Sequence, residues 1–212
     1  GSFYQPKMVI SDIEFLKSLP RRETICGYGE IFKHSLILSK IFFKYLDKNS
    51  SKILNLKSPF IEKAIFESCK IKKIVVERDE KEKNLRKILN FGHTFAHAFE
   101  ATLGYSKKLN HGEAVILGII VALKFSLDNK LIKLREFNQI MKHVLNMNLP
   151  KDIKDYFSHK SLNTILSFMI KDKKNISDKI NLILLKQIGS TIIDNEYNYL
   201  KIKKFLKKEL TY

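Results

Sequence analysis

Long stretches of this chain of 212 residues repeat apolar side chains every three or four positions. Four prolines and eight glycines are all that interrupt them. A repeat near 3.6 residues places apolar side chains on one face of a helix, and Pro and Gly are the residues that most often end one. The pattern predicts a mainly α fold, and a hydrophobic content of 44% is enough to fill its core.

Caps, prolines and apolar repeats indicate where the elements lie. After a β-like run over Lys7–Ile10, we expect Asp12 to cap a short helix that Pro20 ends. The stretch 47–58 reads as a loop. Two β-rich segments, 180–185 and 191–193, predict a small hairpin around Gly189. The longer helices are expected over 23–45, 60–76, 88–103, 113–127, 131–145, 161–170 and 200–210.

The formal net charge is +17, from 39 Lys and Arg against 22 Asp and Glu. Nucleic acid and anionic membranes attract such charge when it is clustered. Here it is spread over the whole chain and is mostly Lys, so we expect neither partner. A basic helical nucleic-acid-binding module is the less favoured alternative.

Cysteine usage and hydropathy indicate a cytoplasmic protein. Cys26 and Cys69 form no CxxC pair, so neither a disulfide framework nor a cysteine zinc site is predicted. No apolar run approaches the ~20 residues of a membrane span, and we expect no signal peptide.

Three histidines and one glutamate suggest a metal site. His93 and His97 are four residues apart and therefore share a helical face, a common arrangement of metal ligands. Two partly buried histidines bonded to neighbouring carbonyls are the alternative. His111, beside Gly112, and Glu30, in a glycine-marked segment, add donors. A carboxylate with imidazoles and no thiolate is typical of a catalytic Zn²⁺, or a similar ion, that keeps positions open for substrate.

Cationic and amide side chains lie near these candidate ligands in sequence. Lys33 follows Glu30 by three residues, and Asn90 precedes His93 by three. Such a pocket suits a phosphorylated or carboxylated substrate, although each lysine taken alone is more often a solvated surface charge. The set comprises Lys33, Lys72, Arg86 and Asn90.

A series of motifs extends over nearly the whole chain. GYGEIFK at 27–33 is followed by KKIVV at 72–76, DEKE at 79–82 and LR at 85–86, then by LNFGHTFAHAFE at 89–100 and HGEAV at 111–115. DKK at 172–174 precedes the β-rich segment. In order and approximate spacing, these motifs resemble those of 3-dehydroquinate synthases.

This resemblance implies the helical C-terminal domain of a dehydroquinate synthase-like fold. Residues 1–22 would be the interdomain crossover and 23–212 the metal- and substrate-binding domain. Because no Gly-rich dinucleotide fingerprint occurs, we expect the N-terminal NAD-binding domain to be absent from this chain and the isolated chain to be inactive.

The activity implied by the resemblance is a carbon–oxygen lyase reaction of the shikimate pathway. It converts 3-deoxy-D-arabino-heptulosonate 7-phosphate into 3-dehydroquinate and phosphate, with NAD⁺ and Zn²⁺ or Co²⁺ as cofactors, in a homodimer. Alternatives are another sugar phosphate cyclase, or a metal-dependent polyol dehydrogenase, of the same broad fold.

The resemblance also assigns residues. It places the metal on Glu30, His93 and His111 and turns His97 toward the substrate, against the pairing of His93 with His97. The positions matched to substrate binding and catalysis are Lys33, Lys72, Arg86, Asn90, His97 and Lys173, with Lys174 as the alternative to Lys173. Those matched to nucleotide contacts are Phe15, Ser18, Leu19 and Arg22.

Three residues depart from the family pattern. Gly29 replaces the usual alanine, and Ala96 and Asn84 replace glycines. The first two are exchanges of small residues. Asn84 is compatible with a left-handed turn, because Asn tolerates positive φ better than other residues with a side chain.

Overall fold

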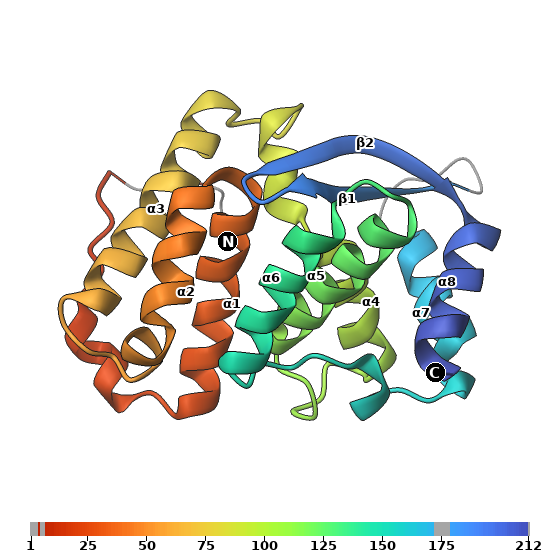
Figure 1. Cartoon of the computed structure of the whole chain (residues 1–212), viewed down its shortest axis with the longest axis horizontal. Helices are drawn as coiled ribbons and strands as arrows, with labels where there is room; N and C mark the ends of the chain where they lie inside the picture. The colour runs from red at the N-terminus through yellow and green to blue at the C-terminus, as the bar shows by residue number, and fades with distance from the viewer. Residues whose placement is uncertain (1–3, 5–6, 172–178, 212) are drawn as a thin grey trace.

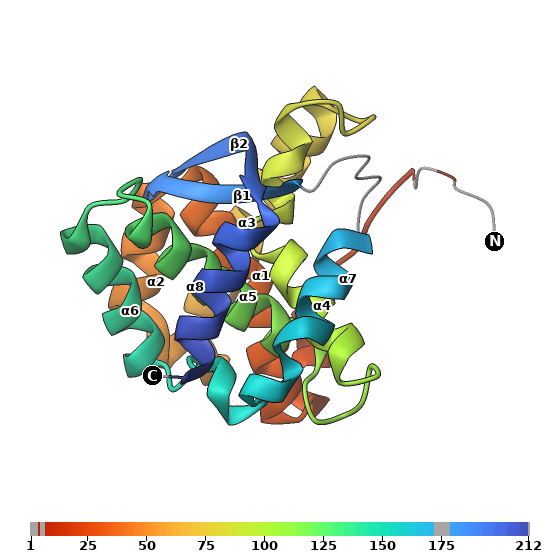
Figure 2. The ribbon, with the colours of Figure 1, turned by 90° about the vertical axis from the view of Figure 1, so that its right-hand side faces the viewer.

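Helix α5 (His111–Asp128) is the element around which the others pack. Fourteen of its 18 residues are buried, and the run from Gly112 to Leu123 is buried without interruption. A helix that is apolar on all sides needs neighbours on all sides. Helices α1, α4 and α6 and strand β1 supply them (Figures 1 and 2).

The computed structural model describes residue 4 and residues 7–171 and 179–211. No helix of this described part is long and apolar enough to cross a membrane. Besides α5, its helices are α1 (Arg21–Leu38), α2 (Lys40–Leu54), α3 (Phe60–Arg78), α4 (His93–Thr102), α6 (Leu134–Asn146), α7 (Leu162–Lys171) and α8 (Tyr199–Thr211). Short 3₁₀ helices are η1 (Ile13–Ser18), η2 (Leu85–Asn90), η3 (Ile153–Asp155) and η4 (His159–Ser161).

An antiparallel hairpin of β1 (Lys179–Gln187) and β2 (Ser190–Asn198) crosses one side of the helices (Figure 1). Its turn residue Gly189 has φ +88°, and its N–H donates to Leu36 O at 2.7 Å. A Cβ at Gly189 would lie 3.0 Å from Lys40 N. The hairpin tip is therefore anchored at the junction of α1 and α2.

The expected mainly α class with a small β element is confirmed, and the expected hairpin lies around Gly189 with longer strands than predicted. Asp12 does cap a short helix, accepting from Glu14 N at 2.9 Å, but the helix is 3₁₀. The β-like run Lys7–Ile10 forms no strand.

Two of the predicted helices are divided, and one predicted loop is mostly helical. The helix expected over 23–45 is broken at Ser39, whose hydroxyl accepts from Phe42 N at 3.1 Å and caps α2. Helix α2 then runs to Leu54, so most of the loop expected over 47–58 is helical. The helix expected over 88–103 is divided at Gly92, which is left-handed with φ +81°. Apolar periodicity cannot detect such breaks, because the repeat continues across them.

A chain of polar side chains links α1, α2 and α6 through the core. Asp47 Oδ1 lies 3.0 Å from His143 Nδ1, and Tyr28 Oη lies 2.7 Å from His143 Nε2. Burial lowers the pKa of His143 despite the nearby Asp47 carboxylate. A neutral imidazole that donates from Nδ1 to Asp47 and accepts from Tyr28 satisfies all three groups.

Helices α4 and α5 are in backbone contact. A Cβ built on Gly118 would lie 2.2 Å from Gly92 O, and one on Gly92 would lie 2.7 Å from Ile119 N. Neither position has room for a side chain. This contact determines how closely the start of α4 approaches the middle of α5.

We expect Gly118→Ala to lower the free energy of unfolding by about 1–3 kcal/mol, because a methyl group would push the two backbones apart. Gly27→Ala is the matched control: Gly27 is also helical but has open space where a Cβ would stand. It should be neutral or raise stability by up to about 1 kcal/mol. Urea unfolding of both variants measures the difference, and equal stabilities would contradict the contact.

Candidate metal centre

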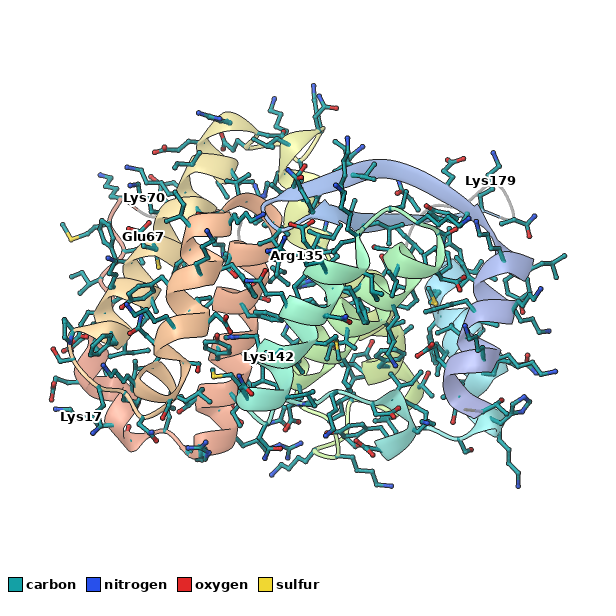
Figure 3. The ribbon with its side chains drawn as sticks, viewed as in Figure 1. Lys17, Glu67, Lys70, Arg135, Lys142 and Lys179 are labelled. Atoms are coloured by element: carbon teal, nitrogen blue, oxygen red, sulfur yellow. The ribbon has the colours of Figure 1, made fainter. Side chains whose placement is uncertain are left out.

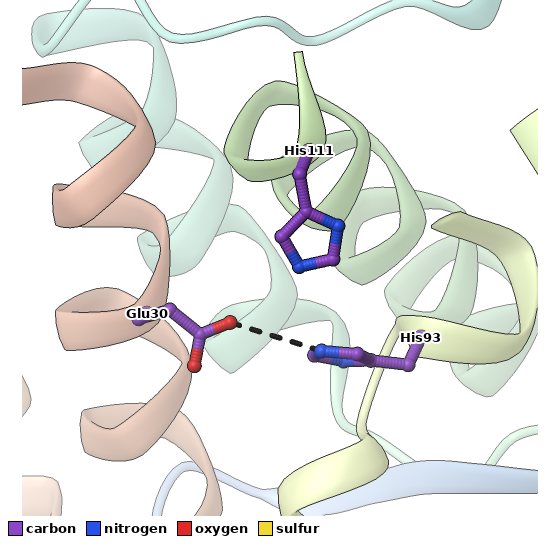
Figure 4. A group of neighbouring side chains, drawn as sticks. All are labelled: Glu30, His93 and His111. Atoms are coloured by element: carbon purple, nitrogen blue, oxygen red, sulfur yellow. Dashed lines mark ion pairs between the residues drawn. The ribbon is translucent and has the colours of Figure 1, made fainter. Parts of the chain in front are cut away.

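Glu30, His93 and His111 converge from three helices (Figure 4). Each offers one ligand atom, and these atoms all lie within 4.8 Å of one another. His93 Nε2 lies 3.8 Å from Glu30 Oε1. Donors around a tetrahedral zinc ion with bonds near 2.0 Å stand about 3.3 Å apart, so small side-chain movements would close the set around an ion.

Helix starts place the two histidines. His93 is the first residue of α4 and follows the left-handed Gly92, while His111 is the first residue of α5. A capping box holds the start of α5, with Asn110 N donating to Glu113 Oε2 at 2.8 Å. The ring centroids of His93 and His111 lie 5.9 Å apart, so the packing of α4 against α5 brings the two imidazoles together.

Two of the donors, Glu30 and His93, are held in the protonation states that a metal requires. Burial, with help from the Lys33 ammonium, lowers the pKa of His93 to about 4. Burial would raise the pKa of Glu30, but Lys33 and neighbouring imidazoles outweigh it and the pKa is lowered. At neutral pH the site therefore presents a neutral imidazole and a carboxylate.

Lys33 orients the carboxylate of Glu30. The Lys33 side chain is 3% exposed, and its Nζ donates to Glu30 Oε2 at 2.7 Å. The other oxygen, Oε1, is the one nearest His93. Lys33 therefore leaves one oxygen of Glu30 available toward the imidazoles.

A polar cavity of about 310 Å³ adjoins the metal donors. Four residues that the sequence analysis singled out line it together with Glu30 and His93. They are Lys33, Lys72, Arg86 and Asn90. The structure therefore brings together, from α1, α3 and η2, side chains up to 57 positions apart in the chain.

The loop before η2 is organised by Asp79. Its carboxylate accepts from Lys83 N at 2.9 Å, Asn84 N at 2.8 Å and Arg86 N at 2.9 Å. These backbone donors lower the pKa of Asp79. Arg86 Nη1 donates to Glu80 O at 2.6 Å, so the loop also holds the guanidinium at the cavity.

Asn84 does not take the left-handed conformation that its type allows. Its φ is −138°, and the positive φ of this loop, +53°, belongs to Glu82. Glu82 also accepts from Asn90 Nδ2 at 2.6 Å and lines the cavity. Asn84 stabilises this turn through its backbone N–H, which donates to Asp79.

His97 is half-buried beside the other imidazoles. Its ring centroid lies 5.4 Å from that of His93 and 6.4 Å from that of His111. Among the described residues, the donor group within 4.8 Å contains His111 rather than His97. The geometry favours His111 as the third ligand and leaves His97 next to the site.

The residues expected to contact a nucleotide lie on η1 and just after it. Phe15 is 74% exposed, and Ser18 and Leu19 are exposed as well, so they remain predictions. Leu19 also lines an apolar cavity of about 310 Å³ that reaches Glu30. Arg22 instead donates to Glu113 Oε1 at 2.7 Å and to Lys107 O at 2.8 Å.

The late lysine cannot be placed in the same way, because Lys173 and its alternative Lys174 lie outside the described residues. Sequence reasoning gave no role to Glu82, Glu100 or Glu113, which contact predicted site residues. Glu100 could have been found, since it lies seven positions after His93, or two helical turns along the same face.

Comparison with known proteins identifies the family. The sequence model described as "3-dehydroquinate synthase C-terminal" matches residues 27–175. The chain belongs to this family. It is 64% identical over 211 residues to the 3-dehydroquinate synthase of Pelagibacter ubique (strain HTCC1062), covering 100% of this chain and 57% of the relative. It is 41% identical over 190 residues to that of Alkaliphilus metalliredigens (strain QYMF), covering 90% and 52%.

The chain thus spans about half the length of the curated relatives it matches. Solved structures share the fold of this family domain. A 2-deoxy-scyllo-inosose synthase complexed with carbaglucose-6-phosphate, NAD⁺ and Co²⁺ has a TM-score of 0.81 at 25% identity, over 98% of this chain and 58% of that one. A 2-epi-5-epi-valiolone synthase from Streptomyces hygroscopicus, with NAD⁺ and Zn²⁺ bound, has a TM-score of 0.78 at 19% identity, over 93% and 54%.

The burial of histidines in the folded chain makes its free energy of unfolding depend on pH. His34 is 4% exposed, and burial together with Lys33 lowers its pKa to about 4. Between pH 6.5 and 4, His34 is protonated in the unfolded chain but stays neutral in the folded chain. The free energy of unfolding therefore falls as the pH falls. Each such histidine should contribute a slope of up to about 1.4 kcal/mol per pH unit.

We expect His34→Asn to remove one histidine's share of this slope, because Asn has no proton to gain and can still bond Ser68, 2.7 Å from His34 Nδ1. Urea unfolding in EDTA at pH 6.5 and 5.0 should then show a loss smaller by about 1.6 kcal/mol than in the wild type. His159→Asn, at an exposed histidine, should keep the wild-type slope. An unchanged slope in His34→Asn would contradict the assignment.

Proposed function

We propose that this chain is the metal- and substrate-binding part of a 3-dehydroquinate synthase. The reaction is conversion of 3-deoxy-D-arabino-heptulosonate 7-phosphate to 3-dehydroquinate and phosphate, in the cytoplasm and in a homodimer. The observation that carries the proposal is the polar cavity, in which four matched substrate residues adjoin the metal donors. Membership of the family supports it.

The donor set fits a catalytic divalent ion. One carboxylate and two imidazoles, without thiolate, are typical of Zn²⁺ sites that leave a position for substrate. The lowered pKa values of Glu30 and His93 mean that these donors need not lose protons at neutral pH. Related cyclases carry Zn²⁺ or Co²⁺, in keeping with these ligands.

The charges of the cavity lining support a substrate with two anionic groups. Lys33, Lys72 and Arg86 oppose Glu30 and Glu82 in the cavity lining, which leaves a net charge of +1. A divalent ion would raise this to +3, and a carboxylate with a phosphate monoester carries about −3. Arg86 is suited to a bidentate bond to either group.

Each chain residue then has a definite task. Arg86 and Lys72 bind the anionic groups, and Asn90, whose Nδ2 already donates to Glu82, offers its carbonyl oxygen to a substrate hydroxyl. His97, whose ring lies 5.4 Å from that of His93, would face the substrate and exchange a proton with it. When bound, the ion supplies Lewis acidity at the substrate oxygens, and NAD⁺ supplies reversible hydride transfer.

The crossover would contact NAD⁺ through Phe15, Ser18 and Leu19, which are exposed, and Leu19 also lines an apolar cavity that reaches Glu30. Arg22 would act indirectly, because its guanidinium is committed to Glu113. In well-oriented systems, precise placement of the reactive group lowers the activation free energy by ~7–11 kcal/mol. The crossover residues alone would not hold NAD⁺ in such a position. We therefore expect this chain alone to hold the ion but not to turn over.

We expect His111→Ala to abolish stoichiometric binding of Co²⁺ or Zn²⁺ to this chain, because it removes one of three donors. His97→Ala should keep most of the binding, since the donor group within 4.8 Å does not include it. Isothermal titration with CoCl₂ measures both. If His97→Ala loses the metal and His111→Ala keeps it, the pairing of His93 with His97 is correct instead.

We expect Arg86→Lys to reduce kcat/KM by roughly ten- to a hundredfold, because Lys keeps the charge and loses the bidentate bond. The assay follows phosphate release from the heptulosonate phosphate with NAD⁺ and Zn²⁺. It uses this chain fused to the part of the Pelagibacter ubique relative that it does not cover. Lys87→Arg, at the next residue, is the control variant.

Two results would contradict the proposal. Wild-type kinetics in Arg86→Lys would remove Arg86 from the site. A fused wild-type protein that turns over a substrate without a carboxylate, but not the heptulosonate phosphate, would favour another sugar phosphate cyclase.

A further inference from the structure

The three metal donors are not held equally. The side chain of His93 is 15% exposed, and Lys33 binds one oxygen of Glu30. The side chain of His111 is 56% exposed, so packing alone cannot determine which way its ring faces. The capping box and the Arg22–Glu113 pair hold the backbone where α5 starts, but neither contacts the imidazole of His111.

One carboxylate does contact that imidazole. Glu100 Oε2 lies 3.0 Å from His111 Nδ1, and the Glu100 side chain is 12% exposed. Glu100 lies on α4, two turns after His93 and on the same face. Its position is therefore defined by the helix that also carries His93.

The direction of this bond matters for the chemistry. An ionised carboxylate only accepts hydrogen bonds, so Nδ1 of His111 must carry the proton. Figure 4 shows the other ring nitrogen, Nε2, pointing toward Glu30 and His93. In this tautomer Nε2 has a free lone pair, as a metal ligand requires.

We propose that, as Lys33 orients Glu30, Glu100 is the residue that positions His111 in the metal centre. Its carboxylate orients the exposed imidazole of His111, selects the tautomer with the proton on Nδ1 and makes Nε2 a stronger donor. A ligand histidine bonded to a carboxylate through its second nitrogen is a recurring arrangement in metal sites. Glu100 would then be a fourth residue of the metal site beside its three ligands. This inference rests on the proposed function, which includes that metal site.

Metal affinity of the 212-residue chain is the first test. Loss of such an outer partner typically weakens metal binding about 10–100-fold, and we expect Glu100→Ala to raise the Kd for Co²⁺ by this factor. Glu100→Gln keeps an acceptor oxygen and should lose less. Both variants should still bind Co²⁺, whereas His111→Ala should lose Co²⁺ binding completely.

Glu209→Ala is the matched control. The Glu209 side chain is 14% exposed and is paired with Lys124 at 2.6 Å, so this variant removes a carboxylate of similar exposure and the same charge. Lys124 lies 13 residues after His111, about 20 Å along α5. The variant should bind Co²⁺ as the wild type does.

The tautomer of His111 is the second test and needs no metal. Two-dimensional ¹H–¹⁵N spectra of the histidine rings, recorded in EDTA at pH 8.5, distinguish Nδ1–H from Nε2–H. We expect His111 to be Nδ1–H in the wild type and in Glu100→Gln, and to lose this preference in Glu100→Ala. A merely structural role of Glu100 would leave the tautomer unchanged.

The outcomes separate the two proposals. Wild-type affinity and an unchanged tautomer in Glu100→Ala would overturn the positioning role while leaving the metal site intact. Loss as complete as in His111→Ala, with a changed visible spectrum of bound Co²⁺ in Glu100→Gln, would make Glu100 a ligand and also overturn it. A wild-type chain that binds no metal would overturn the proposed metal site and this role together.

Discussion

The backbone contact between α4 and α5 is the constraint on which the site depends. Gly92 and Gly118 have no space for a Cβ, so the two helices touch along their main chains. His93 and His111 are the first residues of these helices, and Glu100 of α4 can reach the ring of His111 for the same reason. A larger residue at either glycine would push the start of α4, which carries His93, away from α5.

A second constraint is electrostatic. Lys33 is buried beside Glu30, where its positive charge would be costly without a partner. Burial lowers the pKa of Lys33, and the ion pair with Glu30 opposes that effect. The same ammonium helps to lower the pKa values of His93 and Glu30. The cavity lining therefore combines a carboxylate and an imidazole, from Glu30 and His93, with cationic side chains.

Three basic side chains of this strongly basic chain, Lys33, Lys72 and Arg86, line the polar cavity. Lys72 and Arg86 come from α3 and η2, and the Asp79 loop holds Arg86 through backbone donors. Among the remaining cations, Lys52 and Lys63 lie over aromatic rings of their own neighbourhood. The net charge of the chain therefore says little about its function. The convergence of a few cations beside the candidate metal donors says much more.

Residue types and local spacing in the sequence determined the helical class, the hairpin around Gly189 and the set of chemically capable side chains. These depend on periods of two and 3.6 residues and on donor chemistry, which are properties of short segments. Only the tertiary structure decided the helix break at Gly92, the ion pair that occupies Arg22, and the bond between Glu100 and His111. Those features arise where segments that are distant in the chain meet, and a local pattern carries no record of which backbone will approach which side chain.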